Sequence, residues 1–262
     1  MIVREQPDGS LVMICQTDHA KLSGQLAAHW GNTQFDKPRP YDSVVRAATF
    51  HDSGWYGYET GPSINPETGK TLNFLQVPWG PVQRRAFQWA IDWMTDLDPY
   101  SGLLLSRHRT GLQRGRYGVL THPTFYNTQN IPDDNIDFLN SNEEKQQQAL
   151  KNYDASEFAT NYRLFQTWDL LSLELCNKDI LKGDFIEPVP ISYDESKSAP
   201  VKMSLTTLEP RTVEVTPYPF VIRPLNVHLT RRRLPISTFP DLATFRQAYY
   251  QAPIETVTFK LI

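Results

Sequence analysis

The spacing of apolar residues changes twice along the chain. The first 15 residues alternate between apolar and polar positions around the turn sequence Pro7-Asp8-Gly9, a pattern typical of a β-hairpin. From there to about residue 176, apolar residues recur every three or four positions, as they do on one face of a helix. This spacing predicts helices over residues 18–30, 43–52, 81–96, 100–113, 141–152 and 156–178.

The second change comes near Gly183, where prolines multiply and β-type runs appear. These runs cover residues 201–208, 212–215, 225–229 and 256–262, and one short helix is predicted over residues 241–252. Two long irregular stretches, residues 56–80 and 114–140, interrupt the helical region. Stretches of that length within a domain are typical of lids or binding loops.

These patterns predict a mainly α protein, in which a helical bundle carries a small β-sheet formed by the C-terminal tail and the N-terminal hairpin. The predicted parts are a hairpin at residues 1–15, a helical domain at 16–182, and a small β-rich subdomain packed on the bundle at 183–262. The helical part is expected to be an all-α bundle.

Composition narrows the class of protein. The chain has 262 residues, of which 40% are hydrophobic and 21% charged, as in ordinary globular proteins. A net charge of −3 gives no general attraction to nucleic acid. No apolar stretch approaches the roughly 20 residues of a membrane-spanning helix, and the two cysteines do not suggest a disulfide framework. We therefore expect a cytoplasmic protein with no nucleic-acid or membrane partner.

Polar side chains occupy positions where the helical spacing would place apolar ones. They are His19, His51, His108 and Asp169, each three or four residues from apolar neighbours on its own predicted helix. Asp52 follows His51 directly. Because burial of an ionised carboxylate without a partner costs several kcal/mol, the inward Asp169 implies a cation, a hydrogen-bond network or a metal nearby.

Each of these positions also has a simpler explanation. A single inward histidine is often a core residue bonded to a backbone carbonyl, and an inward aspartate often pairs with an arginine, here Arg163 or Arg109. These explanations weaken when they must hold on four predicted helices at once. The set therefore favours one shared metal site with the ligands His19, His51, Asp52, His108 and Asp169.

The order of these residues resembles the HD-domain superfamily, which uses a histidine, then a consecutive His-Asp pair, then a distant aspartate on helices. Here the order is His19, His51-Asp52 and Asp169. The phrases QTDHAKLSG, FHDSGW and WDLLSLELC also resemble an uncharacterised bacterial family of related architecture. His108, in SRHRTGL, lies where several HD subfamilies place an additional ligand. The chain lacks a second histidine beside it and a following GYP sequence, which disfavours a cyclic-dinucleotide phosphodiesterase.

The resemblance implies a metal-dependent hydrolase of a phosphate ester or nucleotide, that is, a protein that acts on a small-molecule substrate. Imidazole and carboxylate ligands suit one or two ions of Mn, Fe, Co, Ni or Zn better than Ca. In this hypothesis His108 and Asp52 are the catalytic residues. Arg109 would meet a phosphate, and Trp55 and Tyr58 would form an aromatic wall for a planar group. The simpler alternatives are a solvated surface charge for Arg109 and core packing for Trp55 and Tyr58.

Two other functions fit the same residues. Some HD-type proteins use two irons to oxidise small polyols or phosphonates, so a diiron oxygenase is the first alternative. An O2-sensitive, iron-dependent optical band would distinguish it from a hydrolase. The second alternative is a non-catalytic binding module with a vestigial site, which would take up no metal after reconstitution.

Overall fold

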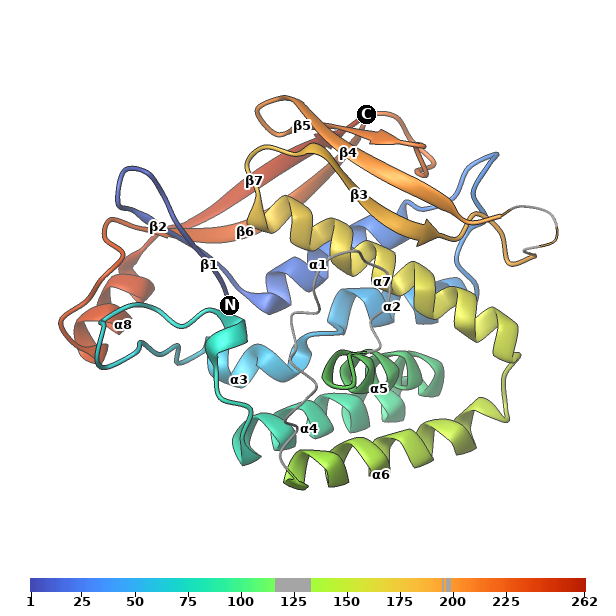
Figure 1. Cartoon of the computed structure of the whole chain (residues 1–262), viewed down its shortest axis with the longest axis horizontal. Helices are drawn as coiled ribbons and strands as arrows, with labels where there is room; N and C mark the ends of the chain where they lie inside the picture. Colours follow the sequence, from blue (N-terminus) through green and yellow to red (C-terminus); the bar gives the residue numbers. More distant parts are fainter. Residues whose placement is uncertain (116–132, 195, 197–198) are drawn as a thin grey trace.

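A computed structural model gives the structure of residues 1–115, 133–194, 196 and 199–262. A curled β-sheet covers one side of a group of helices (Figure 1). The elements follow one another as β1 (Ile2–Glu5), β2 (Leu11–Ile14), α1 (Gln16–Ala28), α2 (Tyr41–Phe50), η1 (Ser53–Trp55), α3 (Tyr56–Glu59), η2 (Phe74–Gln76), α4 (Pro81–Leu97), α5 (Pro99–Gln113), α6 (Asp133–Leu150), α7 (Ala155–Asn177), β3 (Lys182–Val189), β4 (Val201–Glu209), β5 (Thr212–Thr216), β6 (Leu225–Leu234), α8 (Leu242–Gln251) and β7 (Ile254–Leu261).

The sheet has seven strands in the order β1-β2-β6-β7-β5-β4-β3. Its strands pair antiparallel except for β5 and β7, which are parallel. The N-terminal hairpin belongs to it, because Leu11 of β2 pairs with Leu234 of β6. The predicted fold class is therefore wrong: a seven-stranded mixed sheet makes up a whole layer, so the protein is neither mainly α nor an all-α bundle with a small sheet.

The size of the sheet was underestimated because two of its strands were missed or predicted too short. β3 was not predicted, because Gly183 and Pro188 interrupt any regular alternation within it. β6 continues through Arg231, Arg232 and Arg233 to Leu234, beyond the predicted end at residue 229. The arginine run can continue the strand because β2 pairs with it on one side and β7 on the other.

The predicted helices lie close to the observed ones, with one main difference. α6 begins at Asp133, whereas residues 114–140 were predicted to be irregular. Of that stretch, residues 116–132 lie outside the described part of the chain. The other predicted loop, residues 56–80, contains only the short elements α3 and η2.

One hydrophobic cluster joins the helices to the sheet. It includes Leu22 and Leu26 of α1, Trp168 of α7, and Val227 and Leu229 of β6, all at most 2% exposed. α1 packs against β6, and α7 packs against β3 (Figure 1). The sheet thus supports the two helices that carry His19 and Asp169.

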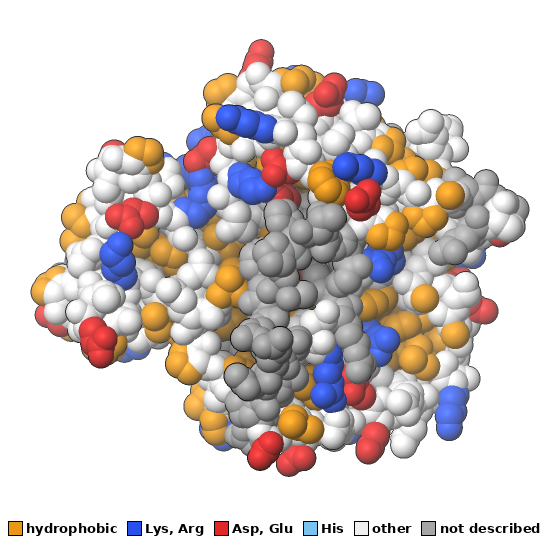
Figure 2. Space-filling view, viewed as in Figure 1, with side chains coloured by type: hydrophobic (Ala, Val, Ile, Leu, Met, Phe, Trp, Pro, Cys, Tyr) orange, Lys and Arg blue, Asp and Glu red, His pale blue; other side chains and the backbone are white. Residues whose placement is uncertain are grey.

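Among the residues with described structure, no helix is long and apolar enough to cross a membrane. Basic and acidic side chains are interspersed over the face shown in Figure 2.

Candidate metal centre

Five buried side chains converge between four segments of the chain. His19 lies on α1, His51 at the end of α2, Asp52 next to it, His108 on α5 and Asp169 on α7, and each is at most 4% exposed. Ligand atoms of His19, His51 and Asp169 all lie within 4.8 Å of one another, and so do those of His51, Asp52 and His108. The structure thus brings all five predicted ligands together, in buried groups that could bind a metal.

The imidazole nitrogens lie close to the carboxylate oxygens. His19 Nε2 is 3.1 Å from Asp52 Oδ2 and 3.5 Å from Asp169 Oδ1. His51 Nε2 is 3.2 Å from Asp169 Oδ1 and 3.3 Å from His19 Nε2. The rings of His51 and His108 meet edge to face with their centroids 4.9 Å apart. These distances place potential ligand atoms from separate helices around one small volume.

Hydrogen bonds outside the cluster decide which nitrogen of His19 faces it. The Ser172 hydroxyl donates to the carbonyl oxygen of Asp169 at 2.7 Å, so it accepts a hydrogen bond from His19 Nδ1 at 2.8 Å. His19 Nδ1 therefore donates to Ser172, and Nε2 is the nitrogen that faces Asp52 and Asp169. A partner of this kind, which fixes the orientation of the ring, is typical of metal-binding histidines.

His51 is oriented in the same way. Its Nδ1 donates to the Ala48 carbonyl at 2.9 Å, which directs Nε2 into the cluster. Burial lowers the pKa of His51, but the carboxylates of Asp52 and Asp169 outweigh burial and raise it to about 9. Burial raises the pKa of each carboxyl, but the neighbouring histidines, with His51 contributing most, together outweigh burial, so both pKa values lie below the usual range. The ionised carboxylates of Asp52 and Asp169 thus both lie beside a positively charged His51.

The pKa of His108 is shifted in the opposite direction to that of His51. Burial, together with the positive charge on His51, lowers the pKa of His108 to about 3. Its ring is therefore neutral at pH 7 and keeps a lone pair that a metal ion could use. The carboxylates of Asp52 and Asp169 and the imidazoles of His19 and His108 are ligand types that a transition-metal ion takes.

A cavity of about 40 Å³ adjoins the cluster and is lined in part by His19, Asp52, His108 and Asp169. It can hold a few water molecules. Trp55 and Arg109 also line the cavity. The Arg109 guanidinium lies 4.1 Å from the ring centroid of Trp79 and 3.8 Å from that of Phe87. Aromatic contacts of this kind stabilise a buried cation beside the cluster.

Tyr58 is placed differently from the other predicted substrate-binding residues. It does not line the cavity, and its ring packs edge to face against Trp55 with centroids 6.0 Å apart. Trp55 itself is 3% exposed and also packs against Phe87. Of the predicted aromatic wall, the structure therefore brings only Trp55 to the site.

Gln16 is a residue of the site that the sequence reasoning missed. It is 3% exposed and lines the cavity, and its Oε1 has no hydrogen-bond partner within the described residues. The carboxylate of Glu59 accepts hydrogen bonds from the backbone amides of Gln16 and Thr17, which anchors the first turn of α1. Gln16 precedes His19 by three positions, so helical spacing could have found it if the helix had been predicted to begin earlier.

The fold and the site define a class, a protein of helices packed on a mostly antiparallel sheet, with a buried cluster of three histidines and two aspartates. The chain belongs to a family described as "Protein of unknown function (DUF3891)", whose profile matches residues 1–236. All five cluster residues lie within the matched region. No curated protein and no solved structure matches the chain. The family description carries no activity, and the resemblance to the HD-domain superfamily stays a prediction.

Proposed function

We propose that this protein is a metal-dependent hydrolase of a phosphate ester or nucleotide. The observation that carries the proposal is the convergence of buried carboxylate oxygens and imidazole nitrogens in two overlapping groups, in each of which the ligand atoms lie within 4.8 Å of one another. Mixed nitrogen and oxygen ligands favour Mn, Fe, Co, Ni or Zn. The proposed ligands are His19, His51, Asp52, His108 and Asp169.

Two overlapping ligand groups support a site for one or two ions. One group contains His19 and Asp169, the other contains Asp52 and His108, and His51 belongs to both. A bound divalent ion supplies a Lewis acid for a phosphoryl oxygen and lowers the pKa of a coordinated water. The protein's own contribution is to keep the ligands oriented and the site buried.

The cavity residues have separate proposed roles. The rings of Trp79 and Phe87 hold the Arg109 guanidinium beside the cavity, and its proposed role is to bind an anionic oxygen of the substrate. His108 is neutral and either completes the ligand set or orients the attacking water, and Asp52 accepts a proton from that water. Trp55 forms an apolar wall. A phosphorylated small molecule is the substrate class that this combination of cation and metal ligands fits.

The proposal is tested by turnover on a panel of phosphomonoesters, phosphodiesters and nucleotides, with protein loaded separately with each of the five metals. Phosphate release that requires both metal and Asp169 is expected. A folded, metal-loaded protein that hydrolyses no member of the panel would contradict the proposal. An iron-dependent optical band that bleaches or shifts with O2 would favour the diiron oxygenase instead.

A further inference from the structure

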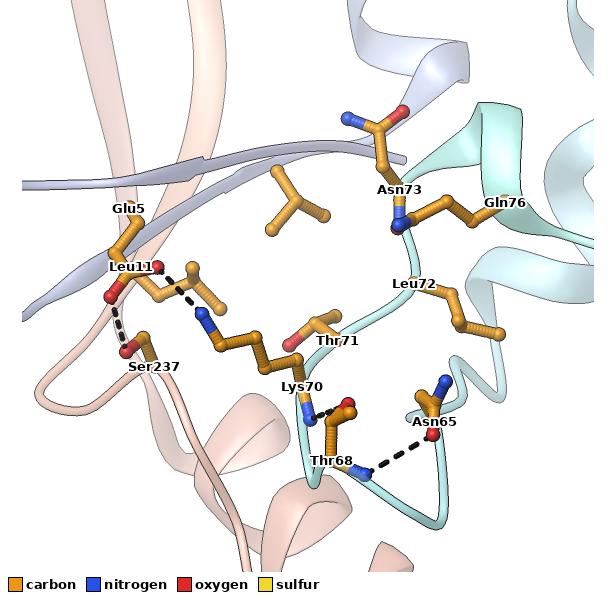
Figure 3. Close-up of a pocket in the computed structure, with 11 residues that line it drawn as sticks. Glu5, Leu11, Asn65, Thr68, Lys70, Thr71, Leu72, Asn73, Gln76 and Ser237 are labelled. Carbon is orange, nitrogen blue, oxygen red and sulfur yellow. Dashed lines mark hydrogen bonds and ion pairs between the residues drawn. The ribbon is translucent and has the colours of Figure 1, made fainter.

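A second pocket, of about 360 Å³, lies away from the metal ligands, between the N-terminal hairpin and the segment 65–76 (Figure 3). Strands β1 and β2 form one side, and the segment that leads to η2 forms the other. Its volume is within the range of roughly 300–1,000 Å³ that is usual for small-molecule sites. None of the five cluster residues lines it.

The walls of this pocket are fixed by backbone contacts. The amides of Asn65 and Gly69 donate to the carbonyls of Lys70 and Asn65, which closes a turn. Gly69 has φ +65°, and a Cβ there would lie 2.2 Å from the carbonyl oxygen of Phe239. A bridge between Lys70 and Thr238 ties the turn to the segment after β6. The pocket is therefore preformed, so a ligand would not have to order it.

The lining combines an aliphatic side with hydroxyl and carboxamide groups. Val3 and Leu72 contribute apolar surface, whereas Thr68, Thr71 and Ser237 contribute hydroxyls. Thr71 is only 7% exposed, and within the described chain its Oγ1 has no hydrogen-bond partner. A buried hydroxyl without a partner loses its hydration without compensation. A ligand hydroxyl in the pocket would restore the missing hydrogen bond.

The carboxamides at the pocket are oriented by the backbone. Asn65 Oδ1 accepts from the amides of Glu67 and Thr68, and Asn73 Oδ1 accepts from the amide of Leu75. With their oxygens engaged, these side chains offer their NH2 groups as donors. Donors of this kind suit hydroxyl or ether oxygens of a ligand.

The two charges at the pocket neutralise each other. The Glu5 carboxylate lies 3.3 Å from Lys70 Nζ and accepts from the Ser237 hydroxyl at 3.0 Å (Figure 3). A charged ligand would have to compete with this ion pair, whereas a neutral one leaves it in place. The balance of charge favours an uncharged ligand.

We propose that this pocket binds a small, uncharged, polyhydroxylated molecule of the size of a monosaccharide. The C–H face of such a molecule would pack on Val3 and Leu72, and its hydroxyls would meet Thr71 and the carboxamide NH2 groups. This site does not depend on the proposed hydrolase activity, since it shares no residue with the metal cavity.

Binding of D-glucose to the full chain, measured by saturation-transfer NMR and calorimetry in the presence of EDTA, tests the proposal. D-gluconate and D-glucosamine serve as anionic and cationic probes of similar size. We expect glucose to bind with millimolar affinity and more tightly than either charged probe. Thr71→Val should weaken glucose binding about tenfold, because the variant loses the hydrogen bond to the buried hydroxyl.

Thr71→Ser, which keeps the hydroxyl, should retain binding. Thr206→Val, on β4 outside the pocket, is the matched control and should bind as the wild type does. Equal affinity in Thr71→Val and the wild type, preference for a charged probe, or no binding of glucose by the folded protein would each overturn the proposal. Because EDTA removes metal, none of these outcomes bears on the hydrolase.

Discussion

The orientation of single side chains decides what the buried cluster can do. The proton on His19 Nδ1 is committed to Ser172, and that on His51 Nδ1 to the Ala48 carbonyl. Both rings therefore direct Nε2 toward Asp52 and Asp169. The hydroxyl of Ser172 acts through His19, so Ser172 is a positioning residue whose effect should be visible in metal affinity.

Ser172→Ala removes the acceptor for His19 Nδ1 and leaves the ring free to rotate or change tautomer. Loss of such an outer partner typically weakens metal binding by about 10–100-fold. Competition with a chelating dye should measure this change for Zn or Co. Ser53→Ala, a serine outside the cluster whose hydroxyl bonds to a local carbonyl, is the control. An unchanged metal affinity in Ser172→Ala would contradict the assigned orientation of His19.

Gln16 should show a conflict between stability and function. Its buried Oε1 has no partner in the described structure, so Gln16→Met, of similar shape, should raise the free energy of unfolding by about 1 kcal/mol. The same change should lower turnover of the substrate found in the panel, while metal content stays near the wild-type value. Urea denaturation and kinetics measure the two effects. A destabilised variant with normal turnover would show that Gln16 is only structural.

At the scale of helices, the site depends on a close crossing of α1 and α2. A Cβ at Gly24 would lie 2.1 Å from Thr49 Oγ1 and 2.9 Å from Thr49 Cα. Backbone atoms cannot move aside as a flexible side chain can. Gly24 thus permits the approach of the two helices that carry His19 and His51.

Gly24→Ala should force these helices apart and cost about 1–3 kcal/mol of stability, with weaker metal binding as a second effect. Gly57→Ala is the matched control, because nothing lies within 4 Å of the added Cβ and alanine favours the helix. Denaturant unfolding of both variants measures the difference. A Gly24→Ala protein as stable as Gly57→Ala would rule out the tight crossing.

The sequence predicted most helices well, because their apolar stripes are long and each pattern is contained in one segment. The start of α6 was missed, since Asp133, Asp134 and Asn135 are residues typical of loops. The five cluster residues could be proposed because helical spacing shows which side chains face inward. Tyr58 could not be placed in this way, since it lies in a helix of only four residues.

At the scale of the whole molecule, the sheet was beyond prediction because its pairings join distant parts of the chain. The hairpin strand β2 meets β6 through Leu11 and Leu234, and no local pattern encodes that contact. Through this pairing, the N-terminal hairpin and the C-terminal strands form one seven-stranded sheet. Since α1 and α7 pack on that layer, the sheet also helps to hold His19 and Asp169 in position.

The central claim is that the cluster binds metal, and metal content by plasma mass spectrometry tests it most directly. Wild type, His51→Ala, Asp169→Asn and the exposed control Asp96→Asn would be compared after reconstitution, with circular dichroism to confirm folding. We predict about one or two ions per chain in the wild type and in Asp96→Asn, and loss of metal in both cluster variants. A folded wild type that takes up no metal, or cluster variants that retain it fully, would contradict the account.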